Sequence, residues 1–189
     1  MNFPKLVSNQ FVRAAGAVLL SVLGFGISSP QCVAQPAAPV ATPVPAPRSP
    51  EAEKAIRDYY AQISVPSYRQ ETDFAIAKLA PDYTETGQDG KLVHRAEAVQ
   101  AMLAGETYFV NPMQCQFVIR SFKWHGEHAV VEEEDENKTT VVTGGQNHAW
   151  DELEMIREVW SLVHGQWMLR STVILQSRDT VDGQVVPAS

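Results

Sequence analysis

The sequence has few cysteines and no apolar run long enough to cross a bilayer. Cys32 and Cys115 are its two cysteines. The first lies in a segment that we expect to be removed, so no disulfide within the mature chain is possible. The longest apolar run, residues 14–27, falls short of the roughly 20 residues of a membrane-spanning helix. The fold must therefore depend on its core alone, and we predict Cys115 to be buried and inert rather than a reactive thiol.

Positive charge is also scarce. Residues 35–189 contain 13 Lys and Arg against 22 Asp and Glu, a net charge of −9. Such a surface repels the phosphates of nucleic acids and anionic lipids. The sequence has no glycine-rich phosphate loop, nucleophile elbow or Cys-x-x-Cys motif. These absences argue against nucleic-acid binding, nucleophilic catalysis and redox work, and they predict no cofactor.

What the chain does have at its start is the pattern of a secretory signal peptide over residues 1–34. A positive region precedes the apolar run, and small residues end at Ala34. We predict cleavage after Ala34, export to the periplasm or the medium, and no stable membrane insertion after removal. Two alternatives are an uncleaved anchor and lipidation of Cys32, although the residues before Cys32 do not form a lipobox.

Prolines mark the boundary of the folded domain. Residues 35–50 hold six prolines among Ala, Val and Thr, a composition that favours an extended, disordered linker. At its end, Ser49-Pro50-Glu51 supplies an N-cap, a proline at the first helical position and an acid in the first turn. We predict that one domain covers residues 51–178 and that residues 179–189 form a flexible tail.

Apolar periodicity predicts helices first and strands afterwards. Ile56, Tyr59, Tyr60 and Ile63 recur at helical spacing, whereas the second half of the chain is rich in Val, Ile, Thr, Phe and Trp between glycine-containing turns. Helices followed by an antiparallel meander indicate an α+β domain with helices packed on one face of a curved sheet. The expected helices cover residues 51–63, 70–79 and 95–103, with a hairpin turning at Asp89-Gly90, and the expected strands cover residues 116–123, 128–142, 149–163 and 167–177.

Several short motifs resemble those of one known superfamily. They are Leu79-Ala80-Pro81-Asp82-Tyr83, Asp89-Gly90-Lys91, Arg95-Ala96-Glu97, Glu158-Val159-Trp160 and Gly165-Gln166-Trp167. Over about residues 51–178 the chain resembles the nuclear transport factor 2-like superfamily, in particular its SnoaL-like and ketosteroid-isomerase-like branch. The resemblance implies a cystatin-like cone, in which a long helix and two shorter ones lie against a strongly curved antiparallel sheet with a pocket between them. Members include isomerases, cyclases, dehydratases and binding modules, but no motif here matches the catalytic residues of the ketosteroid isomerases.

A turn at His164-Gly165 sets the pairing of the last two strands. The expected pairs are Leu162 with Trp167, Trp160 with Leu169, Glu158 with Ser171, and Ile156 with Val173. Glu158 and Ser171 are the polar pair on an otherwise apolar face, which the resemblance places inside the cone. Because apolar surroundings raise the pKa of a carboxyl group, Glu158 is our candidate general acid or base, with Ser171 orienting it. The alternative is that Glu158 pairs with an arginine or lies in water at the sheet edge.

These features predict an exported domain that binds a small apolar molecule, with isomerase-, cyclase- or dehydratase-like catalysis at Glu158. The candidate ligand-binding residues are Glu158, Ser171, Trp160, Tyr83 and Tyr59. The alternative is a non-catalytic interaction or dimerisation module whose cone is filled core. A pocket of roughly 300 Å³ or more that exposes Glu158 favours ligand binding. A homodimer interface, or else a solvated surface, is expected on the opposite face of the last hairpin, which carries Met155, Arg157, Val159, Met168, Arg170 and Ile174.

Two further clusters contain side chains of the kind that bind metal ions. His125 and His128 are three residues apart across an expected turn, whereas the metalloprotease motif needs two histidines four residues apart on a helix. The acidic run from Glu132 to Glu136 lacks the spacing of a calcium loop. We therefore predict no metal site, a solvated turn at the histidines, and a charged strand edge at the acidic run that discourages aggregation.

Overall fold

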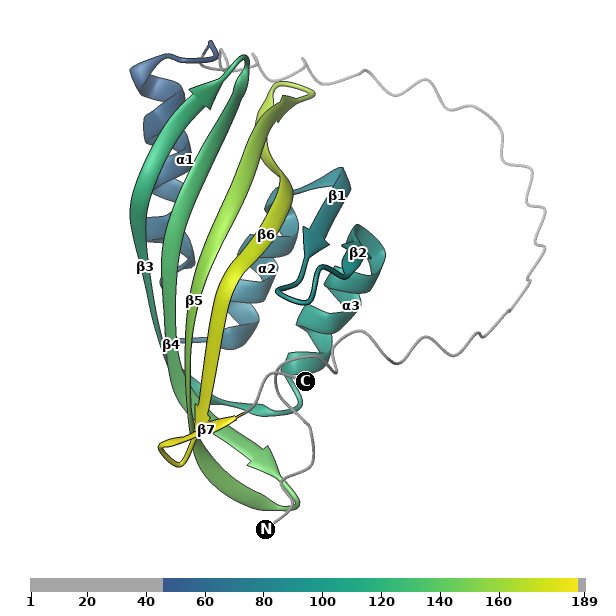
Figure 1. Ribbon diagram of the computed structural model, residues 1–189, viewed down its shortest axis with the longest axis vertical. Helices are drawn as coiled ribbons and strands as arrows, with labels where there is room; N and C mark the ends of the chain where they lie inside the picture. The colour runs from purple at the N-terminus through teal and green to yellow at the C-terminus, as the bar shows by residue number, and fades with distance from the viewer. Residues whose placement is uncertain (1–45, 187–189) are drawn as a thin grey trace, which may run out of the picture.

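The computed structural model describes residues 46–186, so the predicted signal peptide and most of the predicted linker lie outside the described residues. Within these residues, three helices lie against one curved sheet of seven strands (Figure 1). None of the helices in this part of the chain is long and apolar enough to cross a membrane. The helices are α1 (Pro50–Ile63), α2 (Tyr68–Lys78) and α3 (Arg95–Gly105), and the strands are β1 (Leu79–Thr86), β2 (Leu92–His94), β3 (Phe109–His125), β4 (His128–Thr143), β5 (Gln146–Val163), β6 (Gln166–Val181) and β7 (Gln184–Val186).

Helix α1 begins and packs as its sequence predicts. The side chain of Ser49 accepts a hydrogen bond from the Ala52 backbone N–H at 3.0 Å, and Pro50 occupies the first turn. This cap satisfies one of the free N–H groups at the helix start. The four apolar positions that recur at helical spacing are all buried, which confirms the predicted inner side of the helix.

The two shorter helices are also present, with one boundary moved. Helix α2 ends at Lys78, and Leu79 and Pro81, predicted to end the helix, belong to β1 instead. Helix α3 starts after His94, whose backbone N–H donates to the Glu97 carboxylate at 3.2 Å. The predicted hairpin at Asp89-Gly90 is the β1–β2 pair.

The strand order is β2-β1-β6-β5-β4-β3, with β7 on β6. Strands β3 to β6 form the predicted antiparallel meander. Strand β1, however, runs parallel to β6, so the sheet is mixed rather than wholly antiparallel. The side-chain alternation of β1 is the same whichever way its partner runs. Its direction could not be predicted locally, because Leu79 pairs with Leu169 and Thr84 with Ser171, far along the chain.

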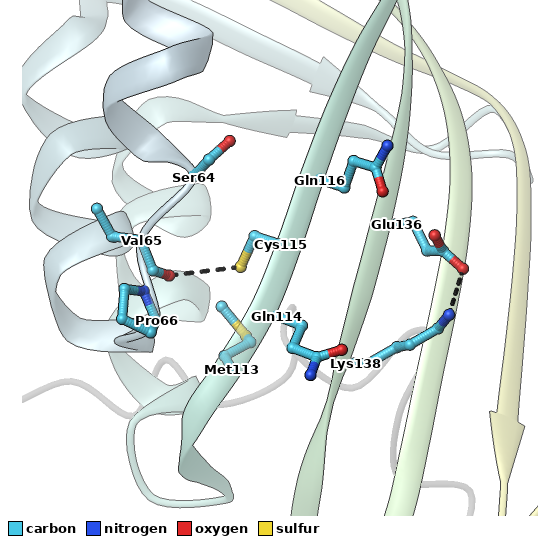
Figure 2. Close-up of a pocket in the computed structure, with 9 residues that line it drawn as sticks. All are labelled: Ser64, Val65, Pro66, Met113, Gln114, Cys115, Gln116, Glu136 and Lys138. Carbon is cyan, nitrogen blue, oxygen red and sulfur yellow. Dashed lines mark hydrogen bonds and ion pairs between the residues drawn. The ribbon is translucent and has the colours of Figure 1, made fainter.

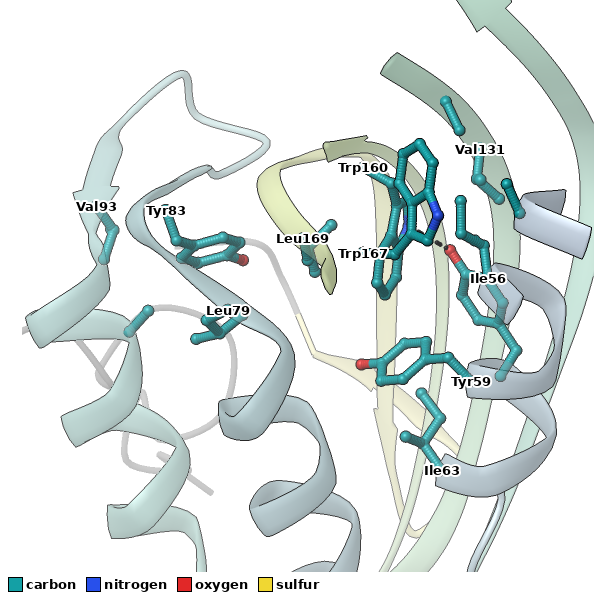
Figure 3. Packing of buried hydrophobic residues seen from close by; sticks show 14 residues of the cluster. Ile56, Tyr59, Ile63, Leu79, Tyr83, Val93, Val131, Trp160, Trp167 and Leu169 are labelled. Atoms are coloured by element: carbon teal, nitrogen blue, oxygen red, sulfur yellow. Dashed lines mark hydrogen bonds between the residues drawn. The ribbon is translucent and has the colours of Figure 1, made fainter. Parts of the chain in front are cut away.

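One sheet face carries Trp160 and packs against the helices, and we call it the inner face. Its main core joins Tyr59 and Tyr60 of α1 to Trp160, Trp167 and Leu169 of the sheet. Figure 3 shows Ile56 and Tyr59 beside the two tryptophans, with Ile63 beyond Tyr59 and with Tyr83 and Leu79 on the far side of Leu169.

A second, smaller core corrects the predicted end of the domain. Val141, Trp150 and Val181 pack together, and Val181 pairs with Trp150 in the sheet. Strand β6 therefore continues to residue 181 and β7 follows it. The prediction of a flexible tail from residue 179 is wrong for residues 179–186. Val181 packs in the second core, and nothing in these few residues alone indicates that contact.

Candidate functional site

Glu158 lies on the inner face of β5, between Ile156 and Trp160, with 6 % of its surface exposed. The Tyr60 hydroxyl of α1 donates a hydrogen bond to its Oε2. The indole N–H of Trp160 donates to the same oxygen at 3.1 Å and to the Tyr60 hydroxyl at 3.2 Å. The carboxyl group thus faces the helices, as the sequence predicts, and is held in a network that joins α1 to the sheet.

The surroundings of Glu158 change its acidity. Burial raises the pKa of Glu158 to about 7, while the hydrogen bonds from Tyr60 and Trp160 act in the opposite direction because they favour the ionised form. No ion pair within residues 46–186 includes Glu158, so the alternative of an arginine partner is not what the structure shows. The group can therefore lose or gain a proton near neutral pH.

The predicted partner of Glu158 is wrong by one residue. Glu158 pairs with Thr172, and Ser171 pairs with Val159 on the opposite face. The register changes between Val159 and Trp160, where β6 carries one extra residue. A bulge of this kind moves every later side chain by one position. The Trp160–Leu169 pair lies on the turn side of the bulge and is as predicted.

The same bulge corrects the remaining predicted pair. Ile156 faces Ile174, and Val173 faces Arg157. Ile174 was expected on the outer face but shares the side of Ile156. Leu162, at the turn end of the face, is 39 % exposed, although its partner Trp167 is buried.

The aromatic candidates form packed core rather than the wall of an open pocket. Tyr59 meets Trp160 edge-on, with 4.9 Å between ring centroids, and Trp167 meets Trp124 edge-on at 5.4 Å. Tyr83 is buried on β1 and its hydroxyl donates to Glu85 at 3.2 Å. Edge-on aromatic pairs of this kind stabilise a core beyond their buried area. The structure therefore brings Tyr59, Trp160 and Glu158 together at the α1 end of the inner face.

The inner face carries further acidic groups that the sequence reading did not identify as a site. They occupy alternate positions on neighbouring strands, so their side chains share one face. Some lie directly opposite each other across strands, as Asp135 does with Glu154 and Glu152 with Asp179. We call these six residues the carboxyl cluster: Glu133 and Asp135 of β4, Glu152, Glu154 and Glu158 of β5, and Asp179 of β6.

Strand β4 is not a sheet edge, which corrects the predicted role of the acidic run. It lies between β3 and β5, so alternate residues point to opposite faces. Glu133 and Asp135 are buried inward, while Glu132 and Glu134 point outward and pair with Arg157 at 2.7 Å and Arg120 at 2.9 Å. Alternation along the acidic run was the signal in the sequence, because every second residue of a strand faces the same side. It indicates buried carboxyl groups only once the strand is known to lie inside the sheet.

The carboxyl cluster is electrostatically unbalanced. Burial raises the pKa of Glu133, Asp135 and Glu152 well above the ordinary range, and the neighbouring carboxylates raise it further. No Lys or Arg forms an ion pair with any member in the described part of the chain. One oxygen each of Glu133, Asp135 and Asp179 is buried without a hydrogen-bond partner among residues 46–186. Groups of this kind stay protonated or need a cation beside them.

Two more carboxyl groups flank the cluster from outside the main strands. Glu71 of α2 accepts a hydrogen bond from the Cys115 thiol at 3.0 Å, and burial raises the pKa of Glu71 to about 7. Glu85 of β1 has its pKa raised by burial. Burial and Glu71 together also raise the pKa of the half-buried Cys115 thiol far above its usual range, which makes it a poor nucleophile.

A separate pocket of about 380 Å³ lies beside β3. The loop after α1 lines one side through Ser64, Val65 and Pro66, and polar side chains line the other (Figure 2). None of the predicted site residues lines it. The pocket is above the roughly 300 Å³ set for a ligand site, but Glu158 does not line it. Its polar side consists of Gln114, Gln116, and the ion pair between Glu136 and Lys138 at 2.7 Å.

The two histidines of the possible metal motif lie opposite each other across the β3–β4 turn. His128 is hydrogen-bonded through Nδ1 to the Ser161 hydroxyl at 2.8 Å. Among residues 46–186, no group of three His, Cys, Asp or Glu side chains has a geometry that could hold a metal ion.

Comparison with known proteins adds evidence at the level of fold. No protein-family model and no curated protein matches the sequence. A conserved protein from Planctomyces limnophilus is similar in structure, with a TM-score of 0.55 and 12 % identity over 65 % of this chain and 94 % of that one. The Kfla4162 protein from Kribbella flavida has a TM-score of 0.52 and 11 % identity over 65 % and 88 %. At such identities the likeness shows a shared fold alone.

The likeness to a third solved structure is lower. A Nostoc punctiforme protein of unknown function with a cystatin-like fold has a TM-score of 0.49 and 16 % identity over 74 % of this chain and 95 % of that one. Helices on one face of a curved sheet are the architecture that the resemblance to the nuclear transport factor 2-like superfamily implies, and the fold class is confirmed.

Proposed function

We propose that this chain is an exported domain that binds a small molecule on the inner face of its sheet, where Glu158 exchanges a proton with it. The setting of Glu158 carries the proposal. The carboxyl group is buried, faces the helices, and receives the hydrogen bonds of Tyr60 and Trp160 on Oε2. Export rests on the signal-like sequence of residues 1–34.

A proton-exchanging carboxyl group in this position suits isomerisation, cyclisation or dehydration. Each of these reactions removes a proton from one atom of a substrate and returns a proton to another. A group with a pKa near the working pH performs both steps well, and burial raises the pKa of Glu158 to about 7. Tyr60 and Trp160 hold the carboxyl group in one orientation, while Thr172 lies opposite it on β6.

The test begins with native mass spectrometry of the protein purified from its own host, which identifies the mature N-terminus and any carried molecule. With that molecule as substrate, Glu158→Gln should lower turnover by about 100-fold or more, because it removes the titrating group and keeps its shape. The matched control is Glu132→Gln on the outer face, which should retain full turnover. Full turnover in Glu158→Gln, with an unchanged fold, contradicts the assignment.

A second candidate function is a non-catalytic interaction module. The packing of Trp160 against Tyr59 and Tyr60 favours it, since these side chains fill the α1 end of the inner face. In this case the outer face of β5 and β6 forms the interface of a homodimer. Native mass spectrometry then shows two subunits and no carried molecule, and Glu158→Gln changes stability alone.

A further inference from the structure

We propose that the carboxyl cluster binds the ammonium groups of an organic polyamine-like cation. This inference rests on the proposed function, because it names the ligand class for the same inner face. It replaces the apolar ligand that the sequence predicts with a charged one. The six carboxyl groups are distributed over three neighbouring strands, so they can meet a ligand at several points.

The first observation is the missing positive charge. Along β4, the outward-facing Glu132 and Glu134 both have an arginine partner, while the inward-facing Glu133 and Asp135 form no ion pair within the described chain. A protein of net charge −9 over residues 35–189 has few cations to place inside. An external cation is the simplest source of the balancing charge.

The second observation is independent of charge. Glu133 is 2 % exposed and Asp179 is 3 % exposed, yet in the part of the chain that the structure describes Oε2 of the first and Oδ1 of the second have no hydrogen-bond partner. Buried acceptors are nearly always satisfied in folded proteins. An ammonium group supplies several N–H donors as well as the charge, so it meets both needs at once.

The third observation is access. Glu152 and Glu154 keep a partial exposure, although they share a face with the buried members. Glu71 of α2 and Glu85 of β1 are also partly exposed and flank the cluster from the helix side and from the strand next to β6. A cation in solvent therefore meets partly exposed carboxyl groups before it reaches Glu133 and Asp179.

The spread of the groups favours an extended organic cation over a metal ion. A metal ion needs its ligands around one point at 2 to 2.6 Å, a geometry that no three such side chains have in residues 46–186. The cluster instead extends between the core around Trp160 and the smaller core around Trp150. An aliphatic chain with two or three amines fits carboxyl groups separated along strands and apolar surfaces at both ends.

Isothermal titration calorimetry of the full chain at pH 7.5 tests this, with spermidine as the probe and 1,8-octanediol as an uncharged compound of similar length. We expect saturable spermidine binding and none of the diol. Glu154→Gln and Asp179→Asn should each weaken spermidine binding at least tenfold, and Glu132→Gln should leave it within twofold. Because the bound cation favours ionised carboxylates, binding should also release protons, which repeat titrations in buffers of different ionisation enthalpy detect.

Four results overturn the ligand class: no saturable spermidine binding, equal binding of the diol, an equal loss in Glu132→Gln, or tighter binding of Ca²⁺ than of spermidine. Thermal melts of both cluster variants confirm that they fold. The proposed function fails separately. A neutral molecule carried by the host-purified protein excludes the amine class but leaves small-molecule binding standing, whereas the absence of any carried or bound molecule contradicts both.

Discussion

Strand β4 places one residue type in two different settings. Glu132 and Glu134 on the outer face pair with Arg157 and Arg120, while Glu133 is buried on the inner face without such a partner in the described chain. Exposed ion pairs contribute at most about 1 kcal/mol each. A buried carboxylate without a counter-ion destabilises the fold, so it is protonated or bound. The setting of each glutamate, not its chemistry, separates a solvated surface from a candidate site.

The largest effect that separates the two faces is the pH dependence of stability. Burial raises the pKa of Glu71, Glu154 and Glu158 to about 7, so the folded state holds more protons than the unfolded state. The stability that these groups contribute is full below about pH 4.3 and is lost as the pH rises through 7. For Glu158 the loss is about 3 kcal/mol.

Thermal melts between pH 4.5 and pH 8.5 measure this dependence. The melting temperature should fall steadily as the pH rises, and added spermidine should recover part of the lost melting temperature at pH 8. A melting temperature that is constant or rises with pH would show that the inner carboxyl groups have positively charged partners.

The next effect comes from a matched pair of substitutions on neighbouring residues. Glu133→Gln should stabilise the ligand-free protein at pH 8 by about 2 kcal/mol, because the buried Glu133 must take up a proton on folding at that pH, whereas Gln is neutral in both states. Glu132→Gln should destabilise it by at most about 1 kcal/mol through the loss of an exposed ion pair. Urea unfolding of both variants at pH 8 gives the two values. Equal effects of the two substitutions would remove the distinction between the faces.

The smallest effect concerns the contact between α1 and Glu158. Tyr60→Phe removes the hydroxyl that donates to Oε2, and should cost about 1 kcal/mol at neutral pH. The pKa of Glu158 should rise further, since that hydrogen bond favours the ionised form. Infrared titration of the carboxyl band, compared with Glu158→Gln to assign it, measures the change. A lower pKa in the variant would mean that Tyr60 does not support the carboxylate.

Several features could be predicted because they depend on neighbouring residues. The Ser49 cap, the buried side of α1 and the turn at His164-Gly165 follow from side-chain hydrogen bonds, helical spacing and glycine conformation. The inward position of Glu158 was also predictable, because alternation from a known turn places it on the face of Trp160. Alternation does not detect bulges, so Ser171 was expected where Thr172 lies.

The sequence by itself determined which residues alternate, where helices begin and how the last hairpin turns. Only the tertiary structure decided that β1 joins β6 in parallel, that β4 is central, and that Glu133, Glu154 and Asp179 share one face. The physical reason is the range of the interactions. Caps, turns and alternation act over a few residues, whereas strand order and the burial of a charged group depend on contacts between segments far apart in the chain.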